Sequence, residues 1–244
     1  VESLRNGWGG GEARWLDPGI AAEFDLGEMP GNRWQVWQDL QEMRIDLVVQ
    51  KAEGRKKRLL IADMDSTMIR QECIDELADE AGVGAHVAAI TARAMNGELD
   101  FEGALRERVG LLKGLAEGVI DQVLRDRITL MPGGKVLLAT MKANGAYAAL
   151  VSGGFTAFTA AVAAQLGFDE NRANRLLVRD GRLAGTVAEP ILGKAAKLQA
   201  LHEIAARLGI TPAEAIAVGD GANDLPMLLG AGTGVALHAK PRVQ

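Results

Sequence analysis

The sequence predicts an α/β protein, a three-layer sandwich with a mostly parallel sheet, plus an inserted helical cap subdomain. Three short stretches, "LLIADMD", "YAALVSGG" and "AIAVGD", are apolar runs that end in Asp, Ser or Gly. Such runs are typical of strands that are buried on both faces of a parallel sheet. About eighty residues separate the first run from the second, far more than the ~10–15 residues of a crossover helix require. We therefore expect an insertion between these strands.

Composition excludes several classes of protein. Of the 244 residues, 48% are hydrophobic and 24% are charged, and the net charge is −5, which is ordinary for a globular protein. No basic block favours nucleic acid or an anionic membrane. The single Cys73 rules out an internal disulfide framework, and no apolar run approaches the ~18–20 residues that span a bilayer. We expect a cytoplasmic protein without nucleic-acid or membrane partners.

Residues 1–50 form an N-terminal segment of unknown role. Its first part is rich in Gly, whereas residues 32–50 space their apolar side chains along one helical face. These side chains are Trp34, Trp37, Leu40, Ile45 and Val48. We predict a helix over 32–50 that packs on another surface, and a partner chain in a homodimer is one option. Because the chain begins with Val and has no signal-peptide pattern, we expect a fragment whose first segment ends a preceding domain.

Residues 51–244 are expected to form the second domain, with the cap at about 73–130. The stretches "CIDELADEAG", "GAHVAAITARAMNG", "DFEGALRERVGLLKG" and "EGVIDQVLRDRI" have helical spacing, and several end at Gly. They predict four short helices that form a lid. Farther along, "PGGKVLLATMKANG" is expected to be a crossover helix, and residues 175–187 a hairpin that turns at Asp180 and Gly181.

Polar side chains follow all three predicted strands. Ligands of open α/β sheets bind outside the carboxyl ends of the strands, so three polar ends imply one shared site. Asp63 and Asp65 follow the first strand two positions apart, which directs both side chains to one side, and Asp220 follows the third strand. Like charges this close repel one another, so either a cation lies between them or they are solvated in a turn.

Three carboxylates in one pocket favour Mg²⁺, which prefers hard oxygen ligands and usually keeps waters or a phosphate oxygen. Zinc is disfavoured because no His or Cys accompanies them. A carboxylate can also attack phosphorus and form an aspartyl-phosphate, while a second acid protonates the leaving alkoxide and later activates water. Asp63 and Asp65 supply candidates for both roles at one strand end.

The motifs "DMDST", "VSGG", a downstream Lys and "GDGAND" resemble, in order and spacing, the four motifs of the haloacid dehalogenase superfamily of phosphohydrolases, which has a Rossmann-like core. Within it, stretches such as "ADMDSTMIRQECIDELA", "ANRLLVRDGRLAGTV" and "AVGDGANDLPML" are similar to the phosphoserine phosphatase family, over roughly residues 59–241. The resemblance implies Mg²⁺-dependent hydrolysis of O-phospho-L-serine to L-serine and phosphate, the last step of serine biosynthesis.

Matched by position, the resemblance implies that Asp63 is the nucleophile and Asp65 the general acid and base. Mg²⁺ would be held by the carboxylates of Asp63 and Asp220 and by the backbone carbonyl of Asp65. Lys197 would neutralise the nucleophile and the phosphoryl group in transfer. Lys194 is the rival for this role, and a position on a helix surface is the alternative for either lysine.

The same resemblance implies that the Ser152 hydroxyl and the Gly153 backbone N–H bind phosphate, as glycines at the start of a helix allow. Asn223 and Asp224 follow Asp220 by three and four residues. The resemblance implies that both lie at the metal site. Asn223 would contact the substrate, and Asp224 would support the groups that bind the metal.

For specificity, the resemblance implies that Glu72 binds the substrate ammonium and that Phe101 and Arg108 contact the rest of the amino acid. Phe101 and Arg108 are seven residues apart, hence on one face of a helix. The alternatives are that Phe101 fills the core of the cap and that Arg108 is a solvated cation.

Two other functions stay open at this point. The same chemistry could act on another small phosphomonoester, or transfer phosphate to an acceptor alcohol such as homoserine. A non-catalytic module could instead sense a ligand through its N-terminal segment, but the presence together of Asp63, Asp65, Lys197 and Asp220 argues against it. The superfamily core normally continues beyond "AKP", so a chain that ends at Gln244 would expose a sheet edge.

Overall fold

The computed structural model describes residues 1–95 and 98–239. It divides into two units, Val1–Lys56 and Lys57–Gln244, so the boundary falls six residues after the predicted one at residue 50. The predicted end of the sheet beyond "AKP" lies outside the described residues. None of the helices in the described ranges is long and apolar enough to cross a membrane.

The first unit contains two helices and one antiparallel strand pair: α1 (Glu2–Gly7), β1 (Arg14–Asp17), β2 (Ala21–Glu23) and α2 (Arg33–Glu42). The helix predicted over 32–50 is wrong in its second half. It ends because Arg44 has a φ of 58°, in the left-handed region, and the amide of Ile45 donates back to the carbonyl of Leu40 at 2.9 Å. The side chains of Trp34 and Val48 are exposed in this unit.

The second unit is built on five parallel strands in the order β5-β4-β3-β8-β9. Their bounds are Leu59–Ala62 for β3, Tyr147–Phe155 for β4, Glu170–Asn174 for β5, Ala215–Gly219 for β8 and Thr233–Ala236 for β9. The three apolar runs of the sequence form the central strands β3, β4 and β8. The predicted α/β fold with a parallel sheet is confirmed.

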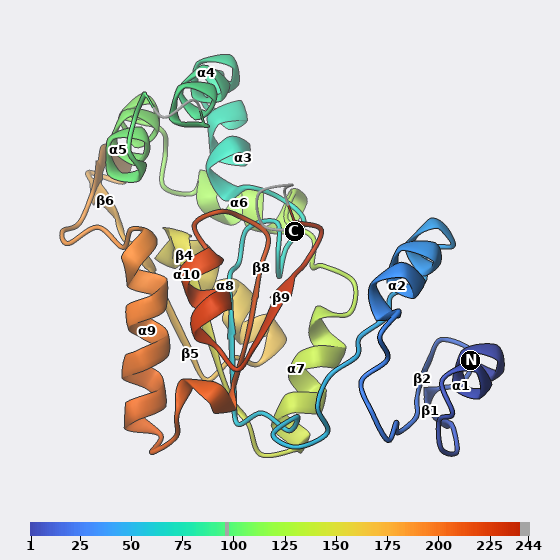
Figure 1. The fold of residues 1–244 in the computed structure, drawn as a ribbon. Coiled ribbons are helices and arrows are strands. Elements are labelled where there is room, and N and C mark those ends of the chain that lie inside the picture. The colour runs from blue at the N-terminus through green and yellow to red at the C-terminus, as the bar shows by residue number, and fades with distance from the viewer. Residues whose placement is uncertain (96–97, 240–244) are drawn as a thin grey trace. The chain divides into compact units, whose positions relative to one another are not determined.

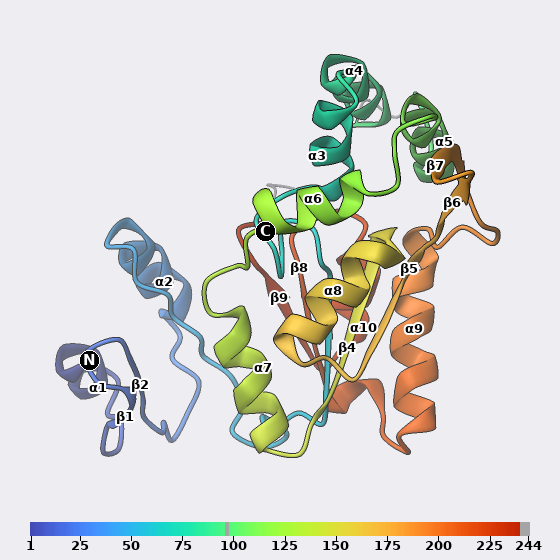
Figure 2. The same ribbon diagram turned by 180° about the vertical axis from the view of Figure 1, so that it is seen from behind.

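Helices cover both faces of this sheet because side chains of the central strand alternate between two cores. Leu60 and Ala62 lie in one core with α7 (Gly134–Ala143) and α8 (Thr156–Leu166), the face seen in Figure 2. Leu59 and Ile61 lie in the other core with α9 (Lys194–Arg207) and α10 (Leu225–Gly230), the face seen in Figure 1. All four residues of β3 are fully buried, which is why its run of apolar residues is unbroken. A short 3₁₀ helix, Pro212–Glu214, leads into β8.

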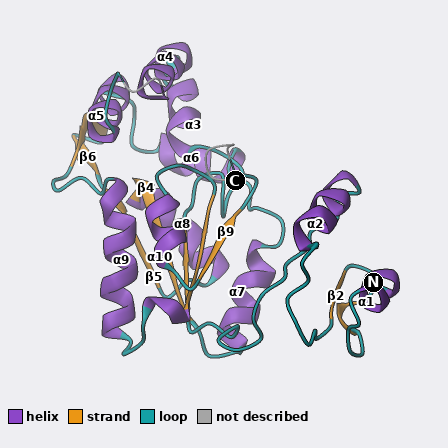
Figure 3. Cartoon of the chain, in the orientation of Figure 1, coloured by secondary structure: helices purple, strands orange, loops and turns teal. Residues whose placement is uncertain are grey.

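The segment between β3 and β4 is helical, as Figure 3 shows. Before α7, its described part contains the four helices α3 (Cys73–Glu80), α4 (Gly84–Met95), α5 (Phe101–Leu111) and α6 (Val119–Asp126). Asp100 begins α5 as an N-cap, because its Oδ1 accepts a hydrogen bond from the Gly103 amide at 2.7 Å. The described part of this segment therefore has the helix content that the sequence predicts for the cap.

A β-hairpin, β6 (Leu176–Arg179) and β7 (Arg182–Val187), joins the sheet region to the cap. Asp180 and Gly181 have φ values of 52° and 70°, as the two central residues of a type I′ turn require. The hairpin bonds to the chain that follows α5, with Gly114 donating to the Leu183 carbonyl at 2.9 Å. The cap is thus held by the hairpin as well as by its own two connections to the sheet.

Candidate active site

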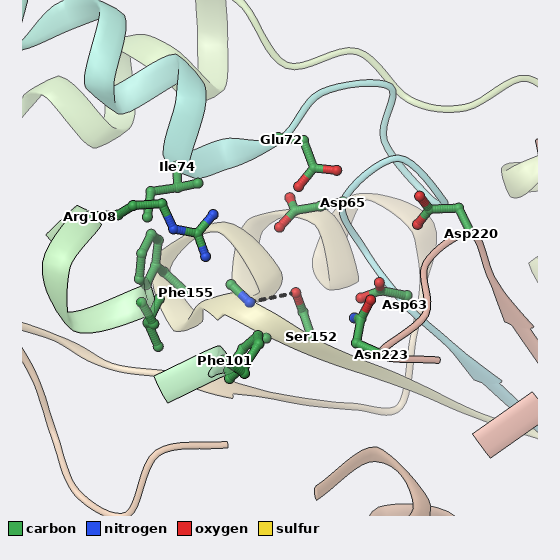
Figure 4. A pocket seen from close by; sticks show the side chains of 13 residues that line it. Asp63, Asp65, Glu72, Ile74, Phe101, Arg108, Ser152, Phe155, Asp220 and Asn223 are labelled. Atoms are coloured by element: carbon green, nitrogen blue, oxygen red, sulfur yellow. Dashed lines mark hydrogen bonds between the residues drawn. The ribbon is translucent and has the colours of Figure 1, made fainter. Parts of the chain in front are cut away.

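A pocket of about 190 Å³ lies at the carboxyl ends of β3, β4 and β8, under α3 and α5. Its walls include nine residues that the sequence analysis singled out: Asp63, Asp65, Glu72, Phe101, Arg108, Ser152, Gly153, Asp220 and Asn223. Apart from Gly153, Figure 4 labels these residues and shows their side chains around one space, from different elements. Lys197 and Asp224, the two other predicted residues, lie behind Asp63.

Asp63 is held by a buried lysine. Lys197 Nζ lies 2.7 Å from Asp63 Oδ1, and the same oxygen accepts a hydrogen bond from the Met64 amide at 2.7 Å. No hydrogen bond from the described residues reaches Asp63 Oδ2. The carboxylate is therefore oriented through one oxygen, and the other oxygen is left to react.

Lys197 lies in the second turn of α9 and is 3% exposed, so the alternative of a position on the helix surface is wrong for it. Its Nζ also contacts Asp224 Oδ1 at 2.6 Å. Burial by itself would lower the pKa of Lys197, but the carboxylates of Asp63 and Asp224 outweigh burial and raise it. Lys197 is therefore a permanent cation at the base of the pocket. Lys194 begins the same helix, and its side chain lies outside the described structure.

Three buried carboxylates gather near this lysine. Asp63, Asp220 and Asp224 each offer an oxygen within 4.8 Å of the others. Both oxygens of Asp224 already accept bonds, Oδ1 from Lys197 and Oδ2 from the Asp220 and Gly221 amides at 3.2 and 2.9 Å. Asp63 and Asp220 are therefore better placed to hold a metal ion, and Asp224 fixes the loop that carries Asp220.

The donor atoms of this cluster suit a hard divalent cation. Lys197 pairs with two of the three carboxylates, Asp63 and Asp224. The donors are oxygen atoms, with no His or Cys among them, which suits magnesium-like ions. Thr67 orients Asp220 by donating to its Oδ1 at 3.3 Å.

Asp65 is a buried carboxyl group of the pocket whose ionisation is strongly perturbed. Burial and the neighbouring Glu72 carboxylate raise its pKa to about 7. Its Oδ1 accepts a hydrogen bond from the Cys73 amide at 3.3 Å, at the start of α3. A carboxyl group with this pKa can both donate and accept a proton near neutral pH.

Glu72 lies at the N-cap position of α3, and a hydrogen bond from Ser66 Oγ at 2.8 Å orients its carboxylate. Ser66 has a φ of 55°, because the chain turns sharply between Asp65 and α3. The sequence analysis did not single out Ser66, although it is part of the quoted "DMDST" stretch.

The loop after the main body of β4 approaches its neighbours so closely that it requires glycine. A Cβ added at Gly153 would lie 2.9 Å from Phe101 Cζ, and one at Gly154 would lie 2.8 Å from Asp65 Oδ2. The Gly154 amide donates to Ser152 Oγ at 2.9 Å. This loop therefore offers the Ser152 hydroxyl and the Gly153 N–H at short range, the kinds of donor that bind an anion.

Phe101 and Arg108 both reach the pocket from α5, as their spacing predicted. Arg108 Nε donates to the Ala104 carbonyl at 3.2 Å, and no described carboxylate lies within 4.0 Å of its guanidinium. Burial lowers the pKa of Arg108, opposed by nearby carboxylates, with Asp75 foremost. Arg108 is thus a partly desolvated cation that points into the pocket (Figure 4), and not a solvated surface residue.

Sequence reasoning missed the apolar walls of the pocket, which are Ile74, Leu105 and Phe155. Ile74 and Leu105 occupy helical positions whose spacing indicates only burial, so it cannot separate a cap core from a pocket wall. Phe155 follows the quoted "VSGG" and is fully buried. These side chains exclude water from one side of the charged groups.

Over residues 60–229 the chain matches the model of a family described as haloacid dehalogenase-like hydrolase. It is 43% identical over 227 residues to a phosphoserine phosphatase of Archaeoglobus fulgidus, covering 91% of this chain and 66% of that protein. It is 48% identical to a phosphoserine phosphatase of Polaromonas sp., covering 77% of this chain and 81% of that protein. The chain thus spans just under two thirds of the length of the Archaeoglobus relative.

A solved structure described as a phospho-aspartyl intermediate analogue of phosphoserine phosphatase has the same fold. It aligns with a TM-score of 0.72 and 43% identity, over 78% of this chain and 90% of that chain. The matched 78% of this chain is about as long as the second unit. Every residue that lines the pocket belongs to that unit.

Proposed function

The chain belongs to the haloacid dehalogenase-like hydrolase family, and from this premise we propose that it hydrolyses O-phospho-L-serine to L-serine and phosphate with the help of Mg²⁺. One observation carries the substrate assignment. A loop suited to bind phosphate lies near Asp63 in the pocket, and a cation, Arg108, and an anion, Glu72, both line the part of the pocket under the cap. Phosphoserine carries a phosphate, a carboxylate and an ammonium group. This reaction would be the last step of serine biosynthesis.

In the first step, Asp63 Oδ2 attacks phosphorus, and the bond between phosphorus and the serine oxygen breaks. Asp65, protonated near neutral pH, gives its proton to that oxygen, so that serine leaves as a neutral alcohol. Lys197 supports the step because its contact with Oδ1 keeps the carboxylate oriented and balances its charge. The product is an aspartyl-phosphate on Asp63, the species that the solved analogue of a relative is described as mimicking.

In the second step, Asp65, now a carboxylate, takes a proton from water as that water attacks phosphorus. The bond from phosphorus to Asp63 breaks, phosphate leaves, and both residues return to their starting forms. The Ser152 hydroxyl and the backbone N–H of Gly153 would bind the phosphoryl oxygens throughout, and the Gly154 N–H orients the Ser152 hydroxyl oxygen. Positioning and charge stabilisation are most of what phosphoryl transfer requires.

Asp63, Asp220 and the backbone carbonyl of Asp65 would hold Mg²⁺, whose charge, when bound, stabilises the negative charge on the phosphoryl oxygens. The identity of the metal rests on the oxygen-only donor set of this cluster. Asn223 lines the same pocket as Asp63 and Asp220, and it would contact a phosphate oxygen. Asp224 supports the site through Lys197 and the backbone of the loop.

Arg108 would bind the substrate carboxylate and Glu72 the ammonium, with Phe101 packing against the side of the substrate. The support for this assignment is that Arg108 has no carboxylate partner among the described residues, whereas Ser66 holds Glu72 in place from outside the pocket. Buried polar groups that have partners only in the bound state favour the ligand that supplies them. A homodimer and a cytoplasmic location stay predictions.

The experiment compares turnover of four phosphate esters by the purified protein. O-phospho-L-serine carries both charged groups, O-phosphoethanolamine lacks the carboxylate, phosphoglycolate lacks the ammonium, and p-nitrophenyl phosphate lacks both. We expect phosphoserine to have the highest kcat/KM and each single omission to lower it at least ~30-fold, because one charge of the pocket is then left without its partner. Equal turnover of all four esters would contradict the substrate assignment and leave a general phosphatase.

The same assay tests the metal. We expect chelation to abolish turnover and Mg²⁺ to restore it, with Ca²⁺ a poor substitute because its larger and looser coordination shell disturbs the in-line geometry. Full activity in excess chelator would contradict the metal assignment without bearing on the choice of substrate.

A further inference from the structure

Asn174 is a buried polar residue that the reaction above does not use. It is 2% exposed and ends β5, the edge strand next to β4. Its side chain makes three hydrogen bonds. Nδ2 donates to the Gly153 carbonyl at 2.9 Å and to the Leu192 carbonyl at 3.3 Å, and Oδ1 accepts from the Leu192 amide at 2.7 Å. Asn174 therefore joins two loops that enter the site from different parts of the chain.

The register of β4 against β5 explains why an amide is needed here. Val151 pairs with Arg172 and Phe155 pairs with Asn174, so three residues of β4 lie opposite one residue of β5. The three, Ser152 to Gly154, leave the ladder and form the anion-binding loop, as bulged residues do. The Gly153 carbonyl loses its ladder partner in this way, and the Asn174 side chain replaces it.

The bond to Gly153 also sets the direction of the next N–H group. In a planar trans peptide, the carbonyl of one residue and the N–H of the next point in opposite directions. Since the Gly153 carbonyl points to Asn174, the Gly154 N–H points away from it, to the side of Ser152 Oγ at 2.9 Å. Rotation of this peptide would break the bond that orients the Ser152 hydroxyl and would turn the Gly153 carbonyl oxygen toward the phosphate side of the site.

The bonds to Leu192 hold the chain that leads into the helix of Lys197. Leu192 lies two residues before the first residue of α9, whose second turn carries Lys197. Only an amide can serve all three groups, because two carbonyls require donors and one N–H requires an acceptor. Asp would present an oxygen to both carbonyls, and Leu would leave all three groups unpaired.

We infer that Asn174 is a positioning residue, which sets the anion-binding loop at Ser152 to Gly154 and the start of the Lys197 helix relative to each other. It touches neither the substrate nor the reacting atoms. It acts on the phosphate side of the pocket and not on the amino-acid side, which distinguishes it from Glu72 and Arg108. The inference rests on the proposed phosphatase function but not on phosphoserine as the substrate.

The test uses Asn174→Leu, a neutral substitution of similar size, with p-nitrophenyl phosphate as substrate and inorganic phosphate as competitive inhibitor. We expect kcat/KM to fall about 10- to 100-fold and the inhibition constant of phosphate to rise at least ~5-fold, because small displacements of positioned groups have effects of this size. Turnover of phosphoserine should fall by the same factor. All assays are run well below the unfolding temperature of each variant.

Thr159→Val is the matched control. Thr159 is fully buried and donates to Asn171 of the same strand β5 at 2.8 Å, but none of its bonds reaches either loop. We expect this variant to lose thermal stability and to keep both kinetic constants within ~2-fold of the parent. Losses in Thr159→Val equal to those in Asn174→Leu would overturn the inference, because any broken bond at β5 would then have the same effect.

Asn174→Ser is the second variant, to be used if Asn174→Leu does not fold. A folded variant with both constants within ~2-fold of the parent would overturn the inference. Failure of both variants to fold would also overturn it, because Asn174 would then serve folding and not positioning. A parent protein that hydrolyses p-nitrophenyl phosphate but not phosphoserine would contradict the substrate proposal alone, and the Asn174 measurements would still decide this inference.

Discussion

Lys197 Nζ lies 2.7 Å from Asp63 Oδ1, although the two residues are more than a hundred positions apart in the chain, and each is almost completely buried. A buried ion pair costs desolvation energy and is rarely retained for stability alone. Here it leaves one carboxylate oxygen oriented for attack and supplies a positive charge beside the phosphoryl group. This relationship carries the first prediction.

Lys197→Met should lower kcat for phosphoserine by about 100- to 1,000-fold, since a preorganised charge at the reacting oxygen is removed. It should also lower the unfolding temperature, because Asp63 and Asp224 lose their shared cation. Steady-state kinetics and circular dichroism melts measure the two effects. Lys142→Met is the control, because Lys142 forms a half-exposed ion pair with Asp169 far from the pocket residues. A kcat within tenfold of the parent for Lys197→Met would contradict the assigned role.

Asp63→Asn should abolish formation of the phospho-enzyme, because an amide cannot act as the nucleophile. Asp65→Asn should still be able to form it and should chiefly slow proton transfer, by roughly 10²–10⁴-fold. Acid quenching followed by mass spectrometry of the intact chain detects the added phosphoryl group. Labelling of the Asp63→Asn chain by substrate phosphate would show that another residue is the nucleophile.

Glu72→Gln and Arg108→Ala should each lower kcat/KM for phosphoserine at least ~30-fold and change that for p-nitrophenyl phosphate less than ~5-fold. Each substitution leaves one charge of the bound amino acid unpaired, and p-nitrophenyl phosphate has no such charges. Arg106→Ala is the matched control on the same helix, because Arg106 pairs with Glu189 at the surface. Equal losses on both substrates would assign these residues to the phosphate site or to the fold.

Gly153→Ala should reduce kcat/KM about tenfold for every ester, because the added Cβ would lie 2.9 Å from Phe101 Cζ and must displace either the ring or the anion-binding loop. Phe101→Leu in the same chain should restore part of the loss on p-nitrophenyl phosphate, since a smaller side chain removes the clash. Gly193→Ala is the control, because its Cβ would meet the same ring at 3.6 Å, an ordinary contact. Full activity of Gly153→Ala would show that the ring moves at no cost.

The stabilising contribution of Glu170 should be lost in acid. Burial opposes ionisation of Glu170, but hydrogen bonds from Arg207, Tyr147 and Arg172 outweigh burial and hold its pKa below the ordinary value of 4.5. A carboxylate with a lowered folded pKa contributes stability above its unfolded pKa, and this contribution is lost as the pH falls through the folded pKa.

The free energy of unfolding of the parent should therefore fall more steeply between about pH 6 and about pH 3 than that of Glu170→Gln. Urea denaturation across this range measures both slopes. Glu117→Gln, at an exposed position of the cap, should keep the slope of the parent. If the free energy of unfolding of the parent and of Glu170→Gln depended on pH in the same way, Glu170 would not be a source of the pH dependence.

The sequence alone was sufficient for the features that depend on short stretches of chain. The unbroken apolar run before Asp63 predicted a strand buried on both faces, and the two-residue spacing to Asp65 predicted one shared pocket, because side-chain direction along a strand follows from backbone geometry. Asp180 and Gly181 predicted the hairpin because both positions of its turn need a positive φ. The helix predicted over 32–50 shows the limit of such patterns, since apolar spacing continued past the point where Arg44 ends the helix.

Only the tertiary structure decided which distant residues meet. The family resemblance implied that Lys197 acts on Asp63, but no pattern in the residues themselves did. That the Phe101 ring rests on Gly153 and that Asn174 replaces a lost ladder bond depend on the register and packing of elements far apart in the chain. These contacts leave no periodic signal, because each is a single pairing whose partner is chosen by how the sheet, the hairpin and the cap close around one pocket. Backbone and turn conformation depend mainly on consecutive residues. Which distant side chains come into contact depends on how the whole core packs and buries its apolar surface.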